Sequence, residues 1–392
     1  MPEHAGFFDA QPVLVGEDRC AKLGATSDLQ RLHGSASGRI DREAIVGALD
    51  RWVRADALHR LASASGWPWP EGPLPATLAE LARRSAGWDF RVRIAAEAAA
   101  TGAERHALTS IPAEVGGKVL DEELVVAAAA DLGLAGGGPP LTGPFTHVVV
   151  LGGMVSAYRR RTAEGARLAR EAGIDRVAVL SAHRPLAGNE PTDAVDAGWG
   201  DMELESEAAA AAARQLLPPA DGADAHATGA ADVGIAVGTA TGTKVATEIF
   251  WHPDDGSTPE GLDPAEHQRR RSWSAHRWTT ADGVDVEVVV APSTEPLERR
   301  TNTSDQLAFW AERAGIDETH ELLLVTTDHY VPAQHFEALR TLALPRGCGI
   351  STTGVEWQPA GAGLRGAAYL QEVRSALLSA ERLLNAAEAL AR

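Results

Sequence analysis

The chain has 392 residues, of which 44% are hydrophobic, and its formal net charge is −18. This length allows two domains with well-formed cores. The acidic balance argues against a general nucleic-acid-binding surface, although a few arginines in a pocket could still hold an anion. The two cysteines, Cys20 and Cys348, lie too far apart in sequence to suggest a disulfide framework or a Cys/His metal motif.

The sequence lacks the features of a membrane or exported protein. No window holds about 18 consecutive apolar residues, the length that a transmembrane helix requires. The start, "MPEHAGFFDAQP", has neither the basic residues nor the apolar core of a signal peptide. We therefore expect a cytoplasmic protein with a small-molecule ligand and no nucleic-acid or membrane partner. Whether it forms a homo-oligomer is left open.

Residues 1–140 are predicted to form a helical N-terminal domain. In "DREAIVGALDRWV", apolar residues recur at the three- and four-residue spacing of an amphipathic helix. The prolines of "WPWPEGPLP" then interrupt the helical pattern. Further helices are predicted for "ATLAELARRSAGW", "WDFRVRIAAEAAATG" and "LDEELVVAAAADLGLAGGG". The glycine- and proline-rich "AGGGPPLTGP" is typical of a linker.

Residues 145–392 are predicted to form a Rossmann-like α/β domain with a mostly parallel sheet flanked by helices. Helical patterns alternate with short apolar runs that are typical of buried parallel strands. These runs are "THVVVLGG", "DRVAVLSAHR", "GVDVEVVVAPST", "ELLLVTTDHY" and "CGISTTGVEW". A long amphipathic helix closes the chain. Residues 218–284 interrupt the alternation, and we interpret them as an insertion beside the sheet with one short strand at "GIAVGT".

Four of the predicted strands end in small or polar residues. In open α/β sheets, ligands bind beyond the carboxyl ends of the strands, so these residues are predicted to line one pocket. In chain order they are Gly152 and Gly153, then Ser181, His183 and Arg184, then Asn302 and Thr303, and finally Thr327, Asp328 and His329.

These residues have different candidate roles in substrate binding. The glycines would let a ligand approach the backbone, or would simply form a tight turn. Arg184 could hold an anionic group as a bidentate fork, or could be an ordinary surface arginine. Thr301 or Thr303 could cap the following helix. Asn302 would then direct its amide toward the pocket.

The candidate catalytic residues are His329, Asp328 and Glu207. A histidine beside a carboxylate can act as a general acid or base. Alternatively, Asp328 caps the next helix and His329 is a packed core histidine. Glu207 could equally complement the dipole of the helix that it begins. Glu190, in the loop after the second strand, is free to point inward.

No metal is expected. A site could be drawn from the insertion residues His252, Asp254, Asp255, His267 and His276. Their spacing matches no known ligand pattern. The tryptophans of the same segment, Trp251, Trp273 and Trp278, could belong to a lid over the pocket or could anchor the insertion to the sheet.

In order and spacing, "VVVLGG", "VAVLSAHR…NE", "ESEAAAAAARQL", "RRTNTSDQLAFW" and "LLLVTTDHYVPAQHFEAL" resemble the SanA/YdcF/ElyC-like family, also called domain of unknown function 218. The chain resembles a soluble, actinobacterial-type member. The resemblance covers about 145–355 and implies a pocket formed by Gly152, Gly153, Ser181, Glu190, Glu207, Asn302, Thr303, Thr327 and His329. The arginine that follows the histidine in the family is replaced here by Ala333 and Gln334. The resemblance also implies that S-adenosylmethionine is a candidate ligand.

These patterns lead to three functional hypotheses. The first is an enzyme, a transferase or hydrolase, that acts on a small anionic or nucleotide-like molecule with His329 as general acid or base. The second is a non-catalytic protein that binds S-adenosylmethionine or a nucleotide. The third is a metal-dependent hydrolase that uses the histidines of the insertion.

Overall fold

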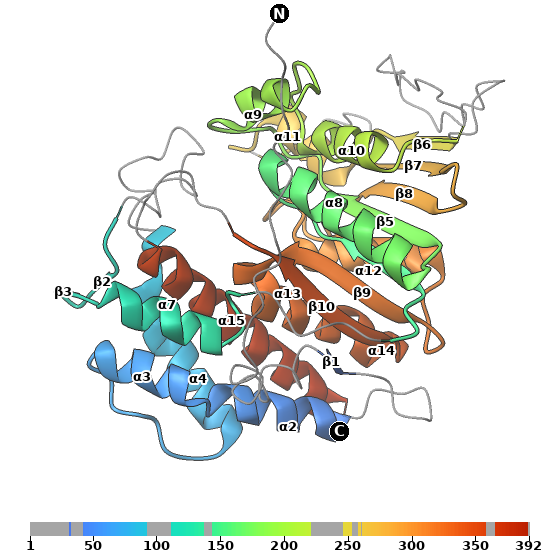
Figure 1. Cartoon of the computed structure of the whole chain (residues 1–392). Coiled ribbons are helices and arrows are strands. Elements are labelled where there is room, and N and C mark those ends of the chain that lie inside the picture. The colour runs from blue at the N-terminus through green and yellow to red at the C-terminus, as the bar shows by residue number, and fades with distance from the viewer. Residues whose placement is uncertain are drawn as a thin grey trace, which may run out of the picture.

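An eight-stranded sheet forms the centre of the protein, whose structure is a computed structural model (Figure 1). The structure describes residues 31–32, 42–91, 111–136, 143–220, 246–252, 258–259, 261–357 and 365–390. The strand order is β1-β10-β9-β4-β5-β8-β7-β6. The strands are β1 (Arg31–Leu32), β4 (His147–Val150), β5 (Arg176–Ser181), β6 (Ala246–Phe250), β7 (Trp273–Thr279), β8 (Asp285–Val290), β9 (Glu321–Thr327) and β10 (Gly349–Val355).

The five inner strands, β10, β9, β4, β5 and β8, are mutually parallel. Outside them, β1 pairs antiparallel with β10, β7 pairs antiparallel with β8, and β6 pairs antiparallel with β7. The inner strands are largely buried because both faces of the sheet are covered, and β4, β5, β8 and β9 each contain an apolar run. In β4, for example, Val148 and Val150 pack into the core of one face and Val149 into the core of the other. This arrangement confirms the predicted α/β fold class.

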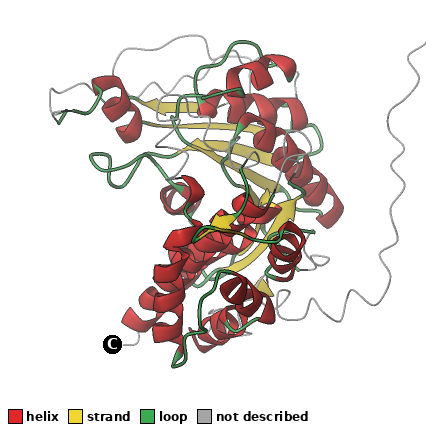
Figure 2. Cartoon of the chain, turned by 90° about the vertical axis from the view of Figure 1, so that its left-hand side faces the viewer, coloured by secondary structure: helices red, strands yellow, loops and turns green. Residues whose placement is uncertain are grey.

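Helices cover both faces of the sheet (Figures 1 and 2). The helices α8 (Val155–Ala172) and α10 (Glu205–Leu216) lie on one face, and α12 (Thr303–Ala314) and α13 (Val331–Ala338) lie on the other. The short α9 (Glu190–Asp196) precedes α10, and a π-helical turn (Leu339–Ala343) joins α13 to α14 (Leu344–Arg346). The C′ residues of α8 and α12, Gly173 and Gly315, adopt the left-handed conformation that terminates helices.

The chain order of the parallel strands explains where a ligand site should form. It runs from β4 through β5 to β8 in one direction, and then returns through α12 to β9 and β10 on the other side of β4. This is the doubly wound order in which the chain reverses beside its first strand. The carboxyl ends of β4 and β9 therefore flank the crevice where such folds bind ligands.

The N-terminal helices pack around the C-terminal helix α15 (Gly366–Ala389), except that α3 (Asp56–Ala64) packs mainly against α7 (Glu122–Asp131). The N-terminal helices are α2 (Arg42–Val53), α3, α4 (Leu74–Arg84) and α7, with a 3-10 turn at Ser85–Trp88 and a small hairpin of β2 (Glu114–Val115) and β3 (Lys118–Val119). The Trp52 indole donates to the Leu132 carbonyl at 3.1 Å and meets Phe336 of α13 edge-on at 5.3 Å. The helical segment thus shares one apolar core with α13 and α15. The helix predicted at 88–102 lies mostly outside the described residues.

The segment at 218–284 differs from the expected irregular insertion, because β6 and β7 extend the sheet at its edge and α11 (Pro264–Arg271) lies between them in sequence. Trp278 is buried and donates to the Leu217 carbonyl at 2.7 Å, so it anchors the segment. Trp273 packs against Phe309 of α12. The stretch "GIAVGT" lies outside the described residues. In the described part of the chain, no helix is long and apolar enough to span a membrane.

Candidate functional site

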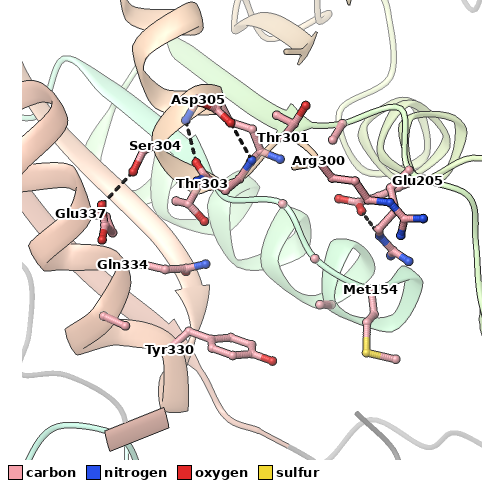
Figure 3. Close-up of a pocket in the computed structure, with 18 of the residues that line it drawn as sticks. Met154, Glu205, Arg300, Thr301, Thr303, Ser304, Asp305, Tyr330, Gln334 and Glu337 are labelled. Atoms are coloured by element: carbon pink, nitrogen blue, oxygen red, sulfur yellow. Dashed lines mark hydrogen bonds and ion pairs between the residues drawn. The ribbon is translucent and has the colours of Figure 1, made fainter. Parts of the chain in front are cut away.

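A cavity of about 1050 Å³ opens at the carboxyl ends of the parallel strands. The ends of β4, β5 and β9 border it, together with the loop after β8 and the helices α11, α12, α13 and α15. Figure 3 shows part of its wall, with Met154 and Glu205 on one side and Gln334 and Glu337 on the other. Of the predicted site residues, the cavity is lined by Gly152, Gly153, His183, Arg184, Asn302, Thr303, Thr327 and His329. Ser181, Glu190, Glu207 and Asp328 are not among the lining residues.

Neighbouring side chains of the protein pack closely against Gly152 and Gly153 and leave little room for a Cβ atom. A Cβ atom at Gly152 would come within 3.0 Å of Gln306 Oε1, and one at Gly153 within 2.9 Å of Arg161 Nη1. Arg161 is almost fully buried, and its guanidinium donates to Thr327 Oγ1 at 3.0 Å and to the Leu151 carbonyl at 2.8 Å. Gly153 therefore leaves room for Arg161, which ties the end of β4 to the end of β9 across the crevice where the chain reverses.

Arg184 is committed to two buried carboxylates. It forms a bidentate pair with Glu190 at 2.8 Å and a second pair with Glu205 at 2.6 Å. Burial alone would lower the pKa of Arg184, but the two carboxylates raise it above its ordinary value. Glu205 also accepts from the Tyr158 hydroxyl at 2.7 Å. This Arg184 cluster, with one cation and two acids, is a poor anion site, and the predicted anion-binding role of Arg184 does not fit it.

His183 lies beside the Arg184 cluster with its ring stacked on Trp251 at 4.7 Å. Its Nδ1 lies 3.2 Å from Ser206 Oγ, and burial, together with the positive charge of Arg269 and the nearby His276, lowers its pKa to about 4. The imidazole is therefore neutral at neutral pH. Ser181 is fully buried at the end of β5, behind the cavity wall.

The start of α12 is capped by Asn302, contrary to the sequence analysis. The Asn302 Oδ1 accepts from the Asp305 amide at 3.0 Å, and the Asp305 carboxylate accepts from the Asn302 amide at 3.0 Å. This reciprocal arrangement is a capping box. Arg299 pairs with Asp305, and Asp305 is nearly fully buried. Thr303 lines the cavity beside the cap.

Asp328 and His329, at the end of β9, make different kinds of contact. Asp328 Oδ1 accepts from the backbone amides of His329 at 2.7 Å and Trp357 at 3.1 Å, which joins the ends of β9 and β10. His329 reaches the cavity, and its ring contacts Tyr330 at 3.9 Å and Trp357 at 4.7 Å. Its Nδ1 is 3.5 Å from Asp328 Oδ1, which is too far for a good hydrogen bond. Asp328 therefore has a structural role, but it does not cap α13, which has no side-chain cap. His329 faces the cavity.

Glu207 and Glu190 have structural contacts. Glu207 Oε2 accepts from the backbone amides of Glu203 at 2.8 Å and Leu204 at 2.9 Å, so its carboxylate caps the start of α10. It does not lie where a catalytic carboxylate would be needed. Glu190 is buried against Arg184, as described above, and also accepts from the Ala187 amide at 3.0 Å.

Sequence reasoning missed the arginines that give the cavity its charge. Ten arginines line it, against six aspartates and glutamates. On α11 and the loop after β8, the nearly buried Glu266 pairs with Arg300 at 2.6 Å and with Arg270 and Arg269 at 3.1 Å each. Burial would raise the pKa of Glu266, but the arginines hold it below its ordinary value. The runs "HQRRR" and "ERRTN" were the available signal for this Glu266 cluster.

A second group of arginines was also missed. Glu337 of α13 pairs with Arg340 at 2.7 Å and accepts from Arg382 Nε of α15 at 2.9 Å. The Ser304 hydroxyl donates to Glu337 at 2.7 Å and accepts from Arg340 at 2.8 Å. Burial would raise the pKa of Glu337, but the two arginines and Ser304 keep it below its ordinary value. We call these residues the Glu337 cluster.

Within the described residues, no three His, Cys, Asp or Glu side chains come together as metal ligands. His276 is buried in β7 with its Nδ1 3.1 Å from Thr247 Oγ1, and His267 Nδ1 lies 3.2 Å from Thr258 Oγ1. The backbone amide of His252 donates to Ser272 Oγ at 3.0 Å. Asp254 and Asp255 lie outside the described residues.

The fold and the cavity define the class: a doubly wound α/β protein with an arginine-rich pocket at the reversal of its strand order. A family model described as the Rv3785 N-terminal domain matches residues 36–133. The chain is 31% identical over 366 residues to "Uncharacterized protein Rv3785" and "Uncharacterized protein MT3893" of Mycobacterium tuberculosis and to "Uncharacterized protein Mb3814" of Mycobacterium bovis. Each match covers 87% of this chain and 90% of the relative. The chain therefore belongs to the Rv3785 family.

This finding corrects the resemblance to the SanA/YdcF/ElyC-like family. The matches run through the helical N-terminal segment as well as the α/β part, and none of them is a member of that family. Short strand-end motifs misled the comparison because every parallel sheet needs small or polar residues where its strands turn into helices. No solved structure matches the chain significantly.

Proposed function

We propose that the protein is an enzyme acting on a small anionic or nucleotide-like molecule bound in the cavity. The observation that carries this proposal is the surplus of arginine over carboxylate in the Glu266 and Glu337 clusters of the cavity wall, in a chain with net charge −18. Guanidinium groups bind carboxylates and phosphates through paired hydrogen bonds. A cytoplasmic location is part of the same proposal, and cell fractionation would test it.

His329 is the proposed general base. Burial lowers its pKa below the ordinary value, and the neighbouring Asp328 only partly offsets this. The imidazole is therefore neutral at neutral pH and can accept a proton from a bound molecule. The position of His329 at the end of β9 places it beside the crevice at which doubly wound folds bind ligands.

A non-catalytic binding protein is the second candidate function. It is favoured by the contacts of Asp328 and Glu207, because both carboxylates are engaged with backbone amides and His329 is left without a catalytic partner carboxylate. Nucleotides and S-adenosylmethionine remain ligands to test for this role. The family resemblance that first suggested S-adenosylmethionine no longer supports it.

One experiment separates the two functions. Thermal shift and calorimetry with nucleotides, phosphate esters, carboxylates and S-adenosylmethionine would identify a bound class, and product analysis would detect turnover. We expect His329→Gln to abolish turnover while affinity changes less than about threefold. The matched control is Arg167→Gln, since Arg167 is paired with Glu164 and Glu171 on the exposed face of α8, outside the cavity wall. Binding without turnover in wild type would favour the second candidate, and no binding of any anion would refute both.

A further inference from the structure

The ion-pair clusters of the cavity wall differ in their balance of arginines and carboxylates. The Arg184 cluster has more acids than cations, and so does Arg299 with its partners Glu295 and Asp305. The Glu266 and Glu337 clusters have more cations than acids. An anionic ligand is attracted only where positive charge remains after the protein's own ion pairs are counted. Among the ion-pair clusters of the cavity wall, the Glu266 and Glu337 clusters therefore offer the positive charge that an anionic group needs.

The Glu266 cluster offers guanidinium groups from two elements. Arg269 and Arg270 lie on α11, and Arg300 lies on the loop that leads into α12. Exposed Asp263 is 3.7 Å from Arg269, so three arginines still face only two carboxylates. The side chain of Arg300 is 57% exposed, which leaves donors of its planar fork available to a ligand.

The Glu337 cluster has the same construction. Arg340 and Arg382 come from adjacent helices and share one nearly buried carboxylate. The side chain of Arg382 is 54% exposed, a value close to that of Arg300. Arg300 and Arg382 are thus equivalent in kind: each is a half-exposed arginine at the rim of a cation-rich cluster that contains one buried glutamate.

The two clusters are joined by a short piece of chain at the start of α12. Arg300 contacts Glu266, and Ser304, four residues later, contacts Glu337. Because extended backbone advances at most ~3.6 Å per residue, the Cα atoms of Arg300 and Ser304 lie no more than about 14 Å apart. Figure 3 shows Ser304 and Glu337 on one side of this piece of chain and Arg300 on the other. A single small molecule can span such a separation.

We propose that the cavity takes a molecule with two separate anionic groups, one held by the Glu266 cluster and the other by the Glu337 cluster. The inference rests on the proposed function and narrows its substrate class. The shared chemistry is a pair of phosphate or carboxylate groups on one flexible or ring-shaped scaffold. The amino end of α12, where Asp305 completes the capping box and pairs with Arg299, lies between the two groups.

Linear alkanediol bisphosphates of increasing chain length, each with its matched monophosphate, are suitable probes. Calorimetry on the full chain should show an affinity maximum at one chain length, where the bisphosphate binds at least about tenfold tighter than its monophosphate. Arg300→Gln and Arg382→Gln should each reduce that advantage about tenfold, and Arg167→Gln should leave it unchanged. The matching dicarboxylates would show which kind of anion is preferred.

Two outcomes would overturn the inference, and only one of them would also refute the proposed function. Bisphosphates that bind no tighter than monophosphates at every length would refute the two-group ligand, while monophosphate binding that depends on Arg300 would leave the proposed function standing. Absence of binding by every phosphate and carboxylate probe would remove both. Retention of the wild-type unfolding transition by both variants is the check that a lost advantage reflects lost contacts.

Discussion

The Arg184 and Glu266 clusters lie on the same cavity and are built from the same residue types in opposite proportion. In the first, one arginine is shared by two buried glutamates; in the second, one buried glutamate is shared by three arginines. Arg184 is four-fifths buried, whereas Arg300 is more than half exposed. The comparison teaches that an arginine in a cavity wall is no sign of an anion site until its own carboxylate partners have been counted.

The physical reason is the cost of leaving a buried charge unpaired. Glu190 and Glu205 are almost fully buried, so each must be compensated within the protein. Arg184 supplies that compensation and holds the end of β5 against α9 and α10. The Glu266 cluster satisfies its carboxylate several times over and keeps surplus positive charge for a ligand. One cluster thus stabilises the fold, and the other is the one that we propose for ligand binding.

The largest expected effect comes from breaking the Arg184 cluster. Arg184→Gln leaves two buried carboxylates without their cation, so we expect the free energy of unfolding to fall by about 3–5 kcal/mol. Urea denaturation followed by circular dichroism measures this loss. The exposed pair in Arg167→Gln should cost less than about 1 kcal/mol. A loss for Arg184→Gln as small as that of the control would show that the Arg184 cluster is not structural.

The next largest expected effect is a pH dependence of stability that arises from buried histidines, including His183 beside the Arg184 cluster. Burial lowers the pKa of His183 to about 4, and that of His147 and His276 to about 4 as well. The unfolded chain binds protons from about pH 6.5 downward while the folded histidines do not. The contribution of these neutral histidines to the free energy of unfolding is therefore fully present above pH 6.5 and is lost as pH falls toward 4. It is on the order of 1–3 kcal/mol per histidine.

Replacing His183 isolates its share of this pH dependence. We expect His183→Gln to unfold with a weaker pH dependence between pH 6.5 and 4 than wild type, whatever its stability at neutral pH. Guanidinium denaturation at several pH values gives the slope. An unchanged slope would mean that His183 titrates normally in the folded protein and is not buried as described.

The smallest expected effect tests how much positive charge Glu266 neutralises in its cluster. Glu266→Gln removes the one carboxylate that three arginines share, so more positive charge remains for a ligand. We expect affinity for inorganic pyrophosphate to rise about tenfold, which corresponds to about 1.4 kcal/mol. Calorimetry at moderate ionic strength measures it, and Glu164→Gln on the exposed face of α8 is the matched control. Weaker pyrophosphate binding in Glu266→Gln would show that the glutamate positions the arginines more than it neutralises them.

Much of the fold could be predicted from the sequence, since local patterns encode it. The apolar run of β4 is typical of a strand covered on both faces, and Gly173 ends α8 because it can adopt the left-handed conformation. The alternation of strands and helices then implied a parallel sheet with ligands at its carboxyl edge. The strands β6 and β7 were missed because edge strands with mixed polar residues carry no clear period.

The sequence by itself determined the fold class and the edge of the sheet at which a site should lie. It also supplied His329 and Thr327, whose place at the end of β9 follows from the strand pattern. Only the tertiary structure decided which arginines are saturated and which are available. The partners of Arg184 come from α9 and α10, and Arg300 meets Glu266 from 34 residues away. Charge balance depends on such contacts between distant elements, and no local pattern records them.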